Sequence, residues 1–182
     1  MRHGQAISNT KDIVSCWPEK FYNPLTELGK QQVRESAEKL KNKKIDLIFS
    51  SDLLRAQQTA GTVAKLLKIK IKFDKRLREQ NSGVFNGQPM SRLKTFFGKR
   101  GLRRFKIKPR NGETYVDIEK RMLDCIKSID EKFKGKNILI VSHGKSIDLA
   151  EAAVRNIPNK DFYKHRIYIG LAGVQKLRGI KT

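Results

Sequence analysis

Acidic residues are scarce in this chain. Its 182 residues contain 18 aspartates and glutamates against 40 lysines and arginines, for a formal net charge of +22. A field of that size attracts polyanions and small anions alike, so the charge alone identifies no partner. A lysine-rich surface without a specific ligand, the steering of small anions and incidental binding of nucleic acid all stay open at this point.

Cysteine and long hydrophobic runs are also lacking. Cys16 and Cys125 lie far apart and form no CxxC pair, so we interpret them as two reduced thiols and not as a disulfide framework. No run of about 18 or more apolar residues occurs, which predicts no membrane-spanning helix and no membrane partner. A charged leader followed by an apolar stretch is absent as well, so we expect no secretory signal and a cytoplasmic location.

The sequence contains little that would bind a metal or a nucleotide. It has only 3 histidines, without HExxH or a Cys/His cluster, and it has no GxxxxGK[ST] loop. We therefore expect neither a metal nor another cofactor. Aromatic residues are not interleaved with a basic stripe on a strand, so nucleic acid is not the expected partner. Nothing in the sequence indicates the oligomeric state.

Apolar residues recur with the periods of strands and helices. Short apolar runs at 45–50 and 137–142 predict buried strands, and 69–73 alternates apolar and basic side chains as in a half-exposed strand. This alternation predicts a single α/β domain over residues 1–182, in three layers, with a mostly parallel central sheet flanked by helices. We expect a helix at 26–41 with Thr26 as its N-cap, and a second helix that begins after Asp52 as its N-cap. Further helices are expected at 91–97, 114–133 and 145–155, and a last strand at 168–177.

Two stretches, 8–25 and 80–112, do not follow this alternation and read as long loops. Long loops inside a compact domain are usually functional or disordered. Sites in open α/β sheets lie beyond the carboxyl ends of the strands. We expect the loops that begin after Ser50 and Ser142 to lie at that edge.

A series of six motifs runs along the chain in the order MRHGQAISN, PLTELGKQQ, SSDLLRAQQTA, LREQNSGVFNG, PRNGET and VSHG. This series closely resembles the histidine phosphatase superfamily, also called the phosphoglycerate-mutase-like family. The resemblance covers essentially the whole chain and is weakest at 92–108 and 156–170. It implies phosphoryl transfer through a phosphohistidine, without a metal, on a small phosphorylated metabolite.

The chemistry of these residue types agrees with that implication. A neutral imidazole is a competent nucleophile near pH 7, and a covalent intermediate divides one difficult displacement into two easier ones. Arginine donates two parallel hydrogen bonds and stays charged, which suits it to the oxygens of a phosphoryl group. The resemblance assigns His3 as nucleophile, Arg2 and Arg55 as phosphate-clamping arginines, His143 as the second histidine at the phosphoryl group, Asn9 as a further phosphate contact, Glu79 as proton donor and later base, and Glu113 as a supporting glutamate.

Each assignment has a plainer alternative. Glu79 could be a surface charge between Arg76 and Arg78, and Glu113 opens a predicted helix, where the helix dipole favours a glutamate regardless of catalysis. His165 lies outside every motif, so we interpret it as structural or exposed.

The segment between Glu79 and Glu113 suggests which class of substrate the protein binds. It contains no acid, and in relatives it forms a variable lid over the pocket. A basic lid at about 80–112 would fit a substrate with a second negative charge; the alternative is the same excess of lysine and arginine found elsewhere. The basic residues are Arg92, Lys94, Lys99, Arg100, Arg103, Arg104, Lys106, Lys108 and Arg110.

The resemblance leaves the reaction partly open. The short chain favours the phosphatase branch, while mutase-type transfer and a degenerate anion-binding protein remain alternatives.

Family members also carry an apolar strand before Arg-His-Gly, and here only Met1 precedes Arg2. We therefore expect a truncated first strand, and higher stability and activity in a chain extended upstream by an apolar run. Ser82 and Asn86 depart from the family pattern and affect the expected packing of the lid.

Overall fold

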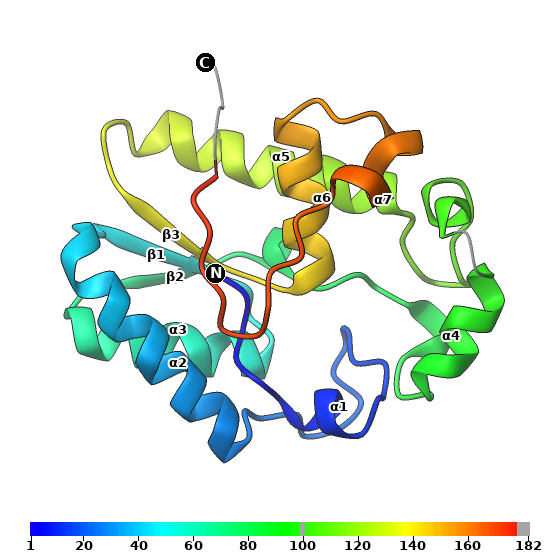
Figure 1. Ribbon diagram of the computed structural model, residues 1–182, viewed down its shortest axis with the longest axis horizontal. Coiled ribbons are helices and arrows are strands. Elements are labelled where there is room, and N and C mark those ends of the chain that lie inside the picture. The colour runs from blue at the N-terminus through cyan, green and yellow to red at the C-terminus, as the bar shows by residue number, and fades with distance from the viewer. Residues whose placement is uncertain (99–100, 178–182) are drawn as a thin grey trace.

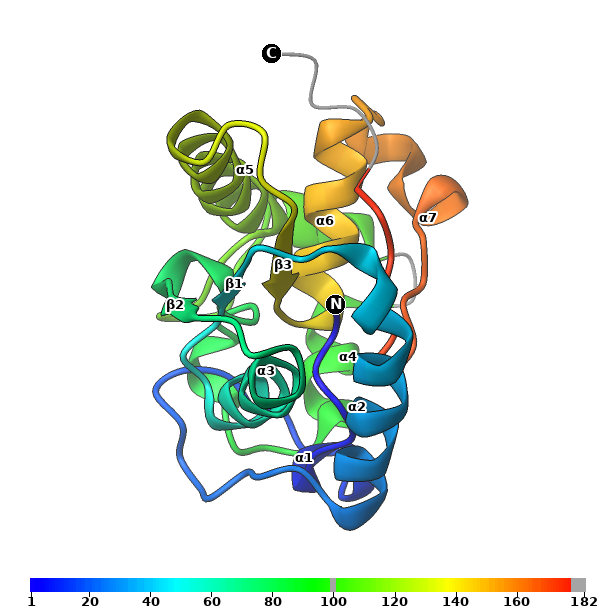
Figure 2. The same ribbon diagram turned by 90° about the vertical axis from the view of Figure 1, so that its left-hand side faces the viewer.

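Three parallel strands form the sheet in the part of the chain that this computed structural model describes, residues 1–98 and 101–177. The strand order is β2-β1-β3. Helices α2 and α3 cover one face and α5 and α6 the other (Figures 1 and 2). The predicted three-layer α/β domain with a parallel sheet is therefore confirmed. The elements are α1 (Ile7–Thr10), α2 (Glu27–Leu40), β1 (Leu47–Ser50), α3 (Leu54–Leu67), β2 (Ile71–Phe73), α4 (Met90–Phe97), α5 (Tyr115–Lys132), β3 (Ile138–Val141), α6 (Gly144–Val154) and α7 (Phe162–His165).

The central strand β1 separates two hydrophobic cores. Ile48 belongs to the core with Val33 of α2 and Val63 of α3, whereas its neighbour Phe49 belongs to the core beneath α5 and α6. Successive side chains of a strand point to opposite faces, so one short apolar run serves both layers. β1 pairs with β3 from Leu47↔Ile138 to Ser50↔Val141, which brings the carboxyl ends of both strands to the same edge.

The helix starts show one confirmed prediction and one wrong one. Thr26 caps α2 as expected, because its hydroxyl accepts a hydrogen bond of 3.0 Å from the amide of Gly29. Asp52 does not cap α3, whose N-cap is Leu53. The carboxylate of Asp52 instead accepts two hydrogen bonds, of 2.6 and 2.5 Å, from the guanidinium of Arg78.

The last expected strand, 168–177, is not formed. The segment lies beside the first residues of the chain: the amide of Arg2 donates to the carbonyl of Gly173, and the amide of Ala172 donates to the carbonyl of His3, both at 3.0 Å. Ala172 has a φ of 55°, in the left-handed region, and this interrupts an extended backbone. Backbone pairing with residues 2–3 thus occurs without a regular strand.

The first three residues continue the sheet along the edge of β3. Arg2 forms a parallel bridge with Ser142, the amide of Ser142 donates to the carbonyl of Met1 at 3.0 Å, and the amide of His3 donates to the carbonyl of Ser142 at 3.1 Å. His3 therefore reaches the carboxyl edge of the sheet next to His143, although the two are 140 positions apart in the sequence.

Cys16 and Cys125 are both buried and free. Within the described residues, no helix has the length and apolar character needed to cross a membrane.

The segment that carries His3 passes very close to α2. A Cβ added at Gly29 would lie 2.0 Å from the carbonyl oxygen of Gln5, whereas one added at Gly61 in α3 would meet nothing within 4 Å. We predict that Gly29→Ala lowers the free energy of unfolding by about 1–3 kcal/mol, as overpacking does. Gly61→Ala should raise it by up to about 1 kcal/mol, the difference in helix propensity. Urea unfolding of both variants measures this, and equal stability would contradict the close contact.

Candidate active site

A cavity of about 450 Å³ opens at the carboxyl edge of the sheet. It brings together side chains from the first residues, the 8–25 loop, α3, α4, α6 and the segment after α7. His143 lies directly behind His3, with 5.1 Å between the ring centroids. Glu113 is not part of the cavity wall. The sequence-predicted residues that line the cavity are Arg2, His3, Asn9, Arg55 and Glu79.

His3 is held as a neutral imidazole with a defined tautomer. Its Nδ1 lies 2.7 Å from the carbonyl oxygen of Gly4, an acceptor, so Nδ1 carries the proton. Its Nε2 accepts a hydrogen bond of 3.2 Å from Nε of Arg55. Burial, and then the charge of Arg55, hold the pKa of His3 well below its usual range. A neutral ring with its lone pair on Nε2 is the form that a nucleophile requires.

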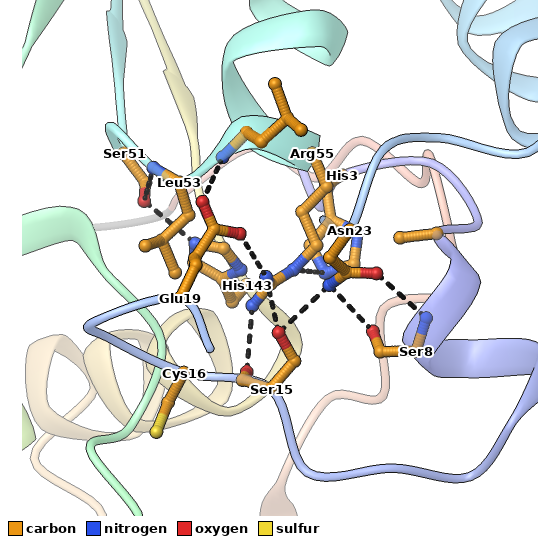
Figure 3. A network of polar contacts seen from close by, with 12 residues as sticks. His3, Ser8, Ser15, Cys16, Glu19, Asn23, Ser51, Leu53, Arg55 and His143 are labelled. Atoms are coloured by element: carbon orange, nitrogen blue, oxygen red, sulfur yellow. Dashed lines mark hydrogen bonds and ion pairs between the residues drawn. The ribbon is translucent and has the colours of Figure 1, made fainter. Parts of the chain in front are cut away.

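Arg55 is almost completely buried, at 2% exposure, and is fixed by the 8–25 loop. Its Nη2 donates to the carbonyl of Ser15 at 3.1 Å and its Nη1 to the hydroxyl of Ser15 at 3.3 Å. Nη1 also lies 3.5 Å from a carboxylate oxygen of Glu19. Figure 3 shows this guanidinium between His3 on one side and Ser15 and Glu19 on the other. The geometry gives Arg55 a fixed place beside Nε2 of His3.

Asn23 ties that loop together behind Arg55. Its side-chain amide donates to the hydroxyls of Ser8 and Ser15 at 3.0 and 2.9 Å, and its Oδ1 accepts from the amide of Ser8 at 2.8 Å (Figure 3). Asn23 is fully buried, so these bonds also satisfy polar groups that water cannot reach.

His143 is the second buried histidine, and its ring contacts Ser51. Ser51 Oγ lies 2.8 Å from His143 Nε2 and accepts a hydrogen bond from the amide of Leu53. A hydroxyl can both donate and accept, so the hydrogen of His143 is on Nδ1 in the tautomer in which Ser51 donates to Nε2. That Nδ1 is buried and has no hydrogen-bond partner in the described structure. Burial and the charge of Arg55 lower the pKa of this ring too.

Arg2 adds a second guanidinium to the cavity wall. Its Nη1 donates to the carbonyl of Ile169 at 3.0 Å, while its buried Nε has no partner among the described residues. A Cβ on Gly144 would lie 3.2 Å from this guanidinium, so the glycine permits the close approach. Gly144 also begins α6, whose N-terminus carries the positive end of the helix dipole. Buried donors without partners, two arginines and a helix N-terminus together form a site for an anion.

Glu79 lies on the cavity wall and its backbone is anchored to α5. One carboxylate oxygen accepts from the amide of Gln80 at 2.8 Å. Arg121 of α5 donates to the carbonyls of Arg76, Arg78 and Glu79 at 2.6, 2.8 and 3.2 Å. The proton-donor candidate is thus on a loop whose backbone is fixed to a helix.

Glu113 holds Arg121 in that position. Its carboxylate pairs with Arg121 at 2.8 and 3.1 Å and accepts from the amide of Asn81 at 2.7 Å. These contacts place it beneath the 79–82 backbone and away from the cavity, where it supports Glu79 indirectly.

Asn9 stands at the exposed rim of the cavity. Its Oδ1 accepts from the amide of Ala6 at 2.9 Å, which leaves its amide nitrogen as the group available to a ligand.

The basic segment reaches the cavity in part. Lys94 of α4 and Arg104 line the wall. Lys99 and Arg100 lie outside the described residues. A metal-binding arrangement of three or more His, Cys, Asp and Glu side chains is not found in residues 1–98 and 101–177.

Sequence reasoning missed the residues that orient the site. Ser15, Ser51 and Asn23 carry no local pattern that marks them, because their roles consist of contacts with residues far away in the sequence. A polar residue directly after a buried strand, as at Ser51, is the one weak signal.

The sequence matches the family described as histidine phosphatase superfamily (branch 1) over residues 1–180. A "Probable phosphoglycerate mutase GpmB" from Yersinia pestis (strain Pestoides F) is 30% identical over 167 residues, which are 87% of this chain and 74% of the relative. Among solved structures, Bacillus stearothermophilus YhfR has a TM-score of 0.83 at 26% identity, covering 94% of this chain and 85% of its own. The mycobacterial glucosyl-3-phosphoglycerate phosphatase Rv2419c, in complex with VO3, has a TM-score of 0.82 at 25% identity, with the same coverage of 94% and 85%.

The buried histidines make stability depend on pH. Because their pKa values are lowered in the folded state, the unfolded chain binds more protons as the pH falls below about 6.5, and stability is lost in that direction. Each neutral histidine contributes a slope of up to about 1.4 kcal/mol per pH unit. We predict that His143→Gln reduces the slope of the free energy of unfolding between pH 6.5 and pH 5, measured by urea unfolding. The exposed His165→Gln serves as control and should leave it unchanged; equal slopes in both variants would refute the assignment.

Proposed function

The chain belongs to the histidine phosphatase superfamily, and we propose that it hydrolyses phosphate monoesters of small metabolites through a phosphohistidine on His3. One observation carries this proposal: a neutral His3 lies on the cavity wall with its Nε2 beside Arg55, and the buried Nε of Arg2 on the same wall lacks a partner among the described residues. The ring of His143 packs 5.1 Å from that of His3, and its buried Nδ1 also lacks a partner there. A phosphoryl group supplies the oxygens that those donors need, and its phosphorus supplies the electrophile.

The first step transfers the phosphoryl group to His3. The Nε–H of Arg55 turns from Nε2 to a phosphoryl oxygen, Nε2 forms the N–P bond, and the ester P–O bond breaks. Glu79, protonated, gives its proton to the leaving oxygen. Arg2, Arg55 and Nδ1–H of His143 stabilise the charge on the equatorial oxygens, as fixed donors do in a loose transition state.

The second step returns the enzyme to its resting form. Glu79, now a carboxylate, takes a proton from water as the water oxygen attacks phosphorus. The N–P bond breaks, inorganic phosphate leaves, and Nε2 regains its lone pair. The guanidinium groups of Arg2 and Arg55 supply the positive charge that a metal would otherwise provide, and this supports a metal-independent reaction.

Mutase-type transfer is the second candidate, favoured by the relative named as a probable phosphoglycerate mutase. It requires a bisphosphorylated intermediate to stay bound and turn before water attacks. Conversion of 3- to 2-phosphoglycerate, stimulated by the bisphosphate, would identify it.

We predict that the protein releases phosphate from p-nitrophenyl phosphate in EDTA and that His3→Ala abolishes this release. Brief reaction with a ³²P-labelled substrate should trap an acid-labile, base-stable phosphoprotein in the unmodified chain and none in the variant. Equal rates for the two proteins would refute the mechanism, and a rate that needs added metal would refute metal independence.

We predict that the effect of Glu79→Gln depends on the leaving group. Loss of a general acid costs about 10²–10⁴-fold in kcat for an alkyl phosphate, whose alkoxide needs a proton. Phosphorylation of His3 by p-nitrophenyl phosphate should be slowed far less, because p-nitrophenolate leaves unprotonated. Single-turnover rates with both substrates measure this. The same loss with both would show that Glu79 is not the proton donor to the leaving group.

A further inference from the structure

A second charged cluster lies on the wall of the same cavity. Asp148 of α6 is 3% exposed, and its Oδ2 lies 3.5 Å from Nζ of Lys145 and 3.6 Å from Nε of Arg166. All three residues line the cavity (α6 and the segment after α7 run side by side in Figure 1). The mechanism above uses none of them.

The cluster is incomplete as it stands. Its ion-pair distances of 3.5 and 3.6 Å are longer than direct hydrogen bonds, and both cations share one oxygen of Asp148. The other oxygen, Oδ1, is buried without a hydrogen-bond partner among the described residues. Buried carboxylates and lysines are rarely left in this condition, because the desolvation of each charge must be offset. The unpartnered atom indicates a bound group that completes the cluster.

The cluster carries more positive than negative charge. Lys145 and Arg166 share the single carboxylate of Asp148. Arg104 joins the same wall through its guanidinium, 4.0 Å from the ring of Phe97 and 5.7 Å from that of Tyr115. In the described part of the chain no carboxylate pairs with Arg104. An anion is therefore the complementary ligand.

The cluster borders the same cavity as Glu79 and the two arginines. Lys145 follows Gly144 at the start of α6, and its Nζ lies 3.5 Å from Oδ2 of Asp148. Nε of Arg55 lies 3.2 Å from Nε2 of His3, so the arginine is beside the nitrogen that would receive the phosphoryl group. A substrate bound between Lys145 and the arginines has its phosphoryl group at the arginines and its alcohol portion at Lys145.

We infer that Lys145, positioned by Asp148 and Arg166, determines specificity by binding a second anionic group on the alcohol portion of the substrate. The inference rests on the proposed function. The substrate class is a phosphate monoester whose alcohol carries a carboxylate or a further phosphate, and a hydroxyl of that alcohol donates to Oδ1 of Asp148. Lys94 and Arg104 add positive charge to the same wall, and this favours a ligand with two or three negative charges.

The test compares 3-phosphoglycerate with glycerol 3-phosphate, which have the same length and differ in the carboxylate. The unmodified enzyme should prefer 3-phosphoglycerate in kcat/KM. Lys145→Met should lower kcat/KM for 3-phosphoglycerate about 10–100-fold through KM, the effect of losing one charge-assisted hydrogen bond. It should change kcat/KM for glycerol 3-phosphate by less than about 3-fold, since that substrate makes no such bond. Lys145→Arg, which keeps the charge, should restore part of the preference.

The control is Lys164→Met, because Lys164 is 76% exposed and pairs only with Asp161 in the described structure. It should leave both substrates unchanged. An equal loss for both substrates in Lys145→Met, or a shifted pH profile of kcat for both, would show that Lys145 acts through Glu79 and would overturn the inference. Lack of preference in the unmodified enzyme for 3-phosphoglycerate, or for a bisphosphate tested beside it, would also overturn it.

Failure of the proposed function has a different signature. In that case the unmodified protein releases phosphate from neither substrate and forms no phosphohistidine, while activity without the preference contradicts the Lys145 assignment alone.

Discussion

The hydrogen bond from Arg55 to Nε2 of His3 is the contact on which the rest of the site depends. It can form only if His3 is neutral, and burial of the ring secures that state. It also requires a guanidinium buried almost completely, whose charge must be compensated. Ser15 and Glu19 compensate it, and Asn23 holds Ser15 in place. The 8–25 loop is therefore the structural support of the arginine, through Ser15 and the fully buried Asn23.

The sheet explains how distant segments meet at this contact. β1 ends at Ser50 and β3 at Val141, and residues 1–3 pair with Ser142 along the same edge. The side chains that follow these points are Ser51, His143 and His3. Parallel strands deliver their carboxyl ends together, so residues from the beginning, the first third and the last quarter of the chain converge. The segment that carries His3 also passes close to Gly29, which holds it against α2.

The sequence was sufficient for the parts of the molecule that local pattern controls. The apolar runs at 45–50 and 137–142 marked β1 and β3, Thr26 marked the start of α2, and the ordered motifs marked His3, Arg55 and Glu79 as members of one site. It failed where a tertiary contact outcompeted local preference. Asp52 pairs with Arg78 instead of capping α3, and the positive φ of Ala172 ends the extended path at 168–177. Ser51 and Asn23 could not be found, because their partners are set only by the folded chain.

Arg121 has a consequence for how such a site can change through evolution. It binds the carbonyls of Arg76, Arg78 and Glu79 to α5, and Glu113 keeps it there. The backbone of Glu79 is thereby tied to α5 by hydrogen bonds that involve no residue of α4. The wall residues of α4 and Arg104 make no part of this anchor. We expect that substitutions there change which substrates fit the cavity, while the backbone of Glu79 keeps its place.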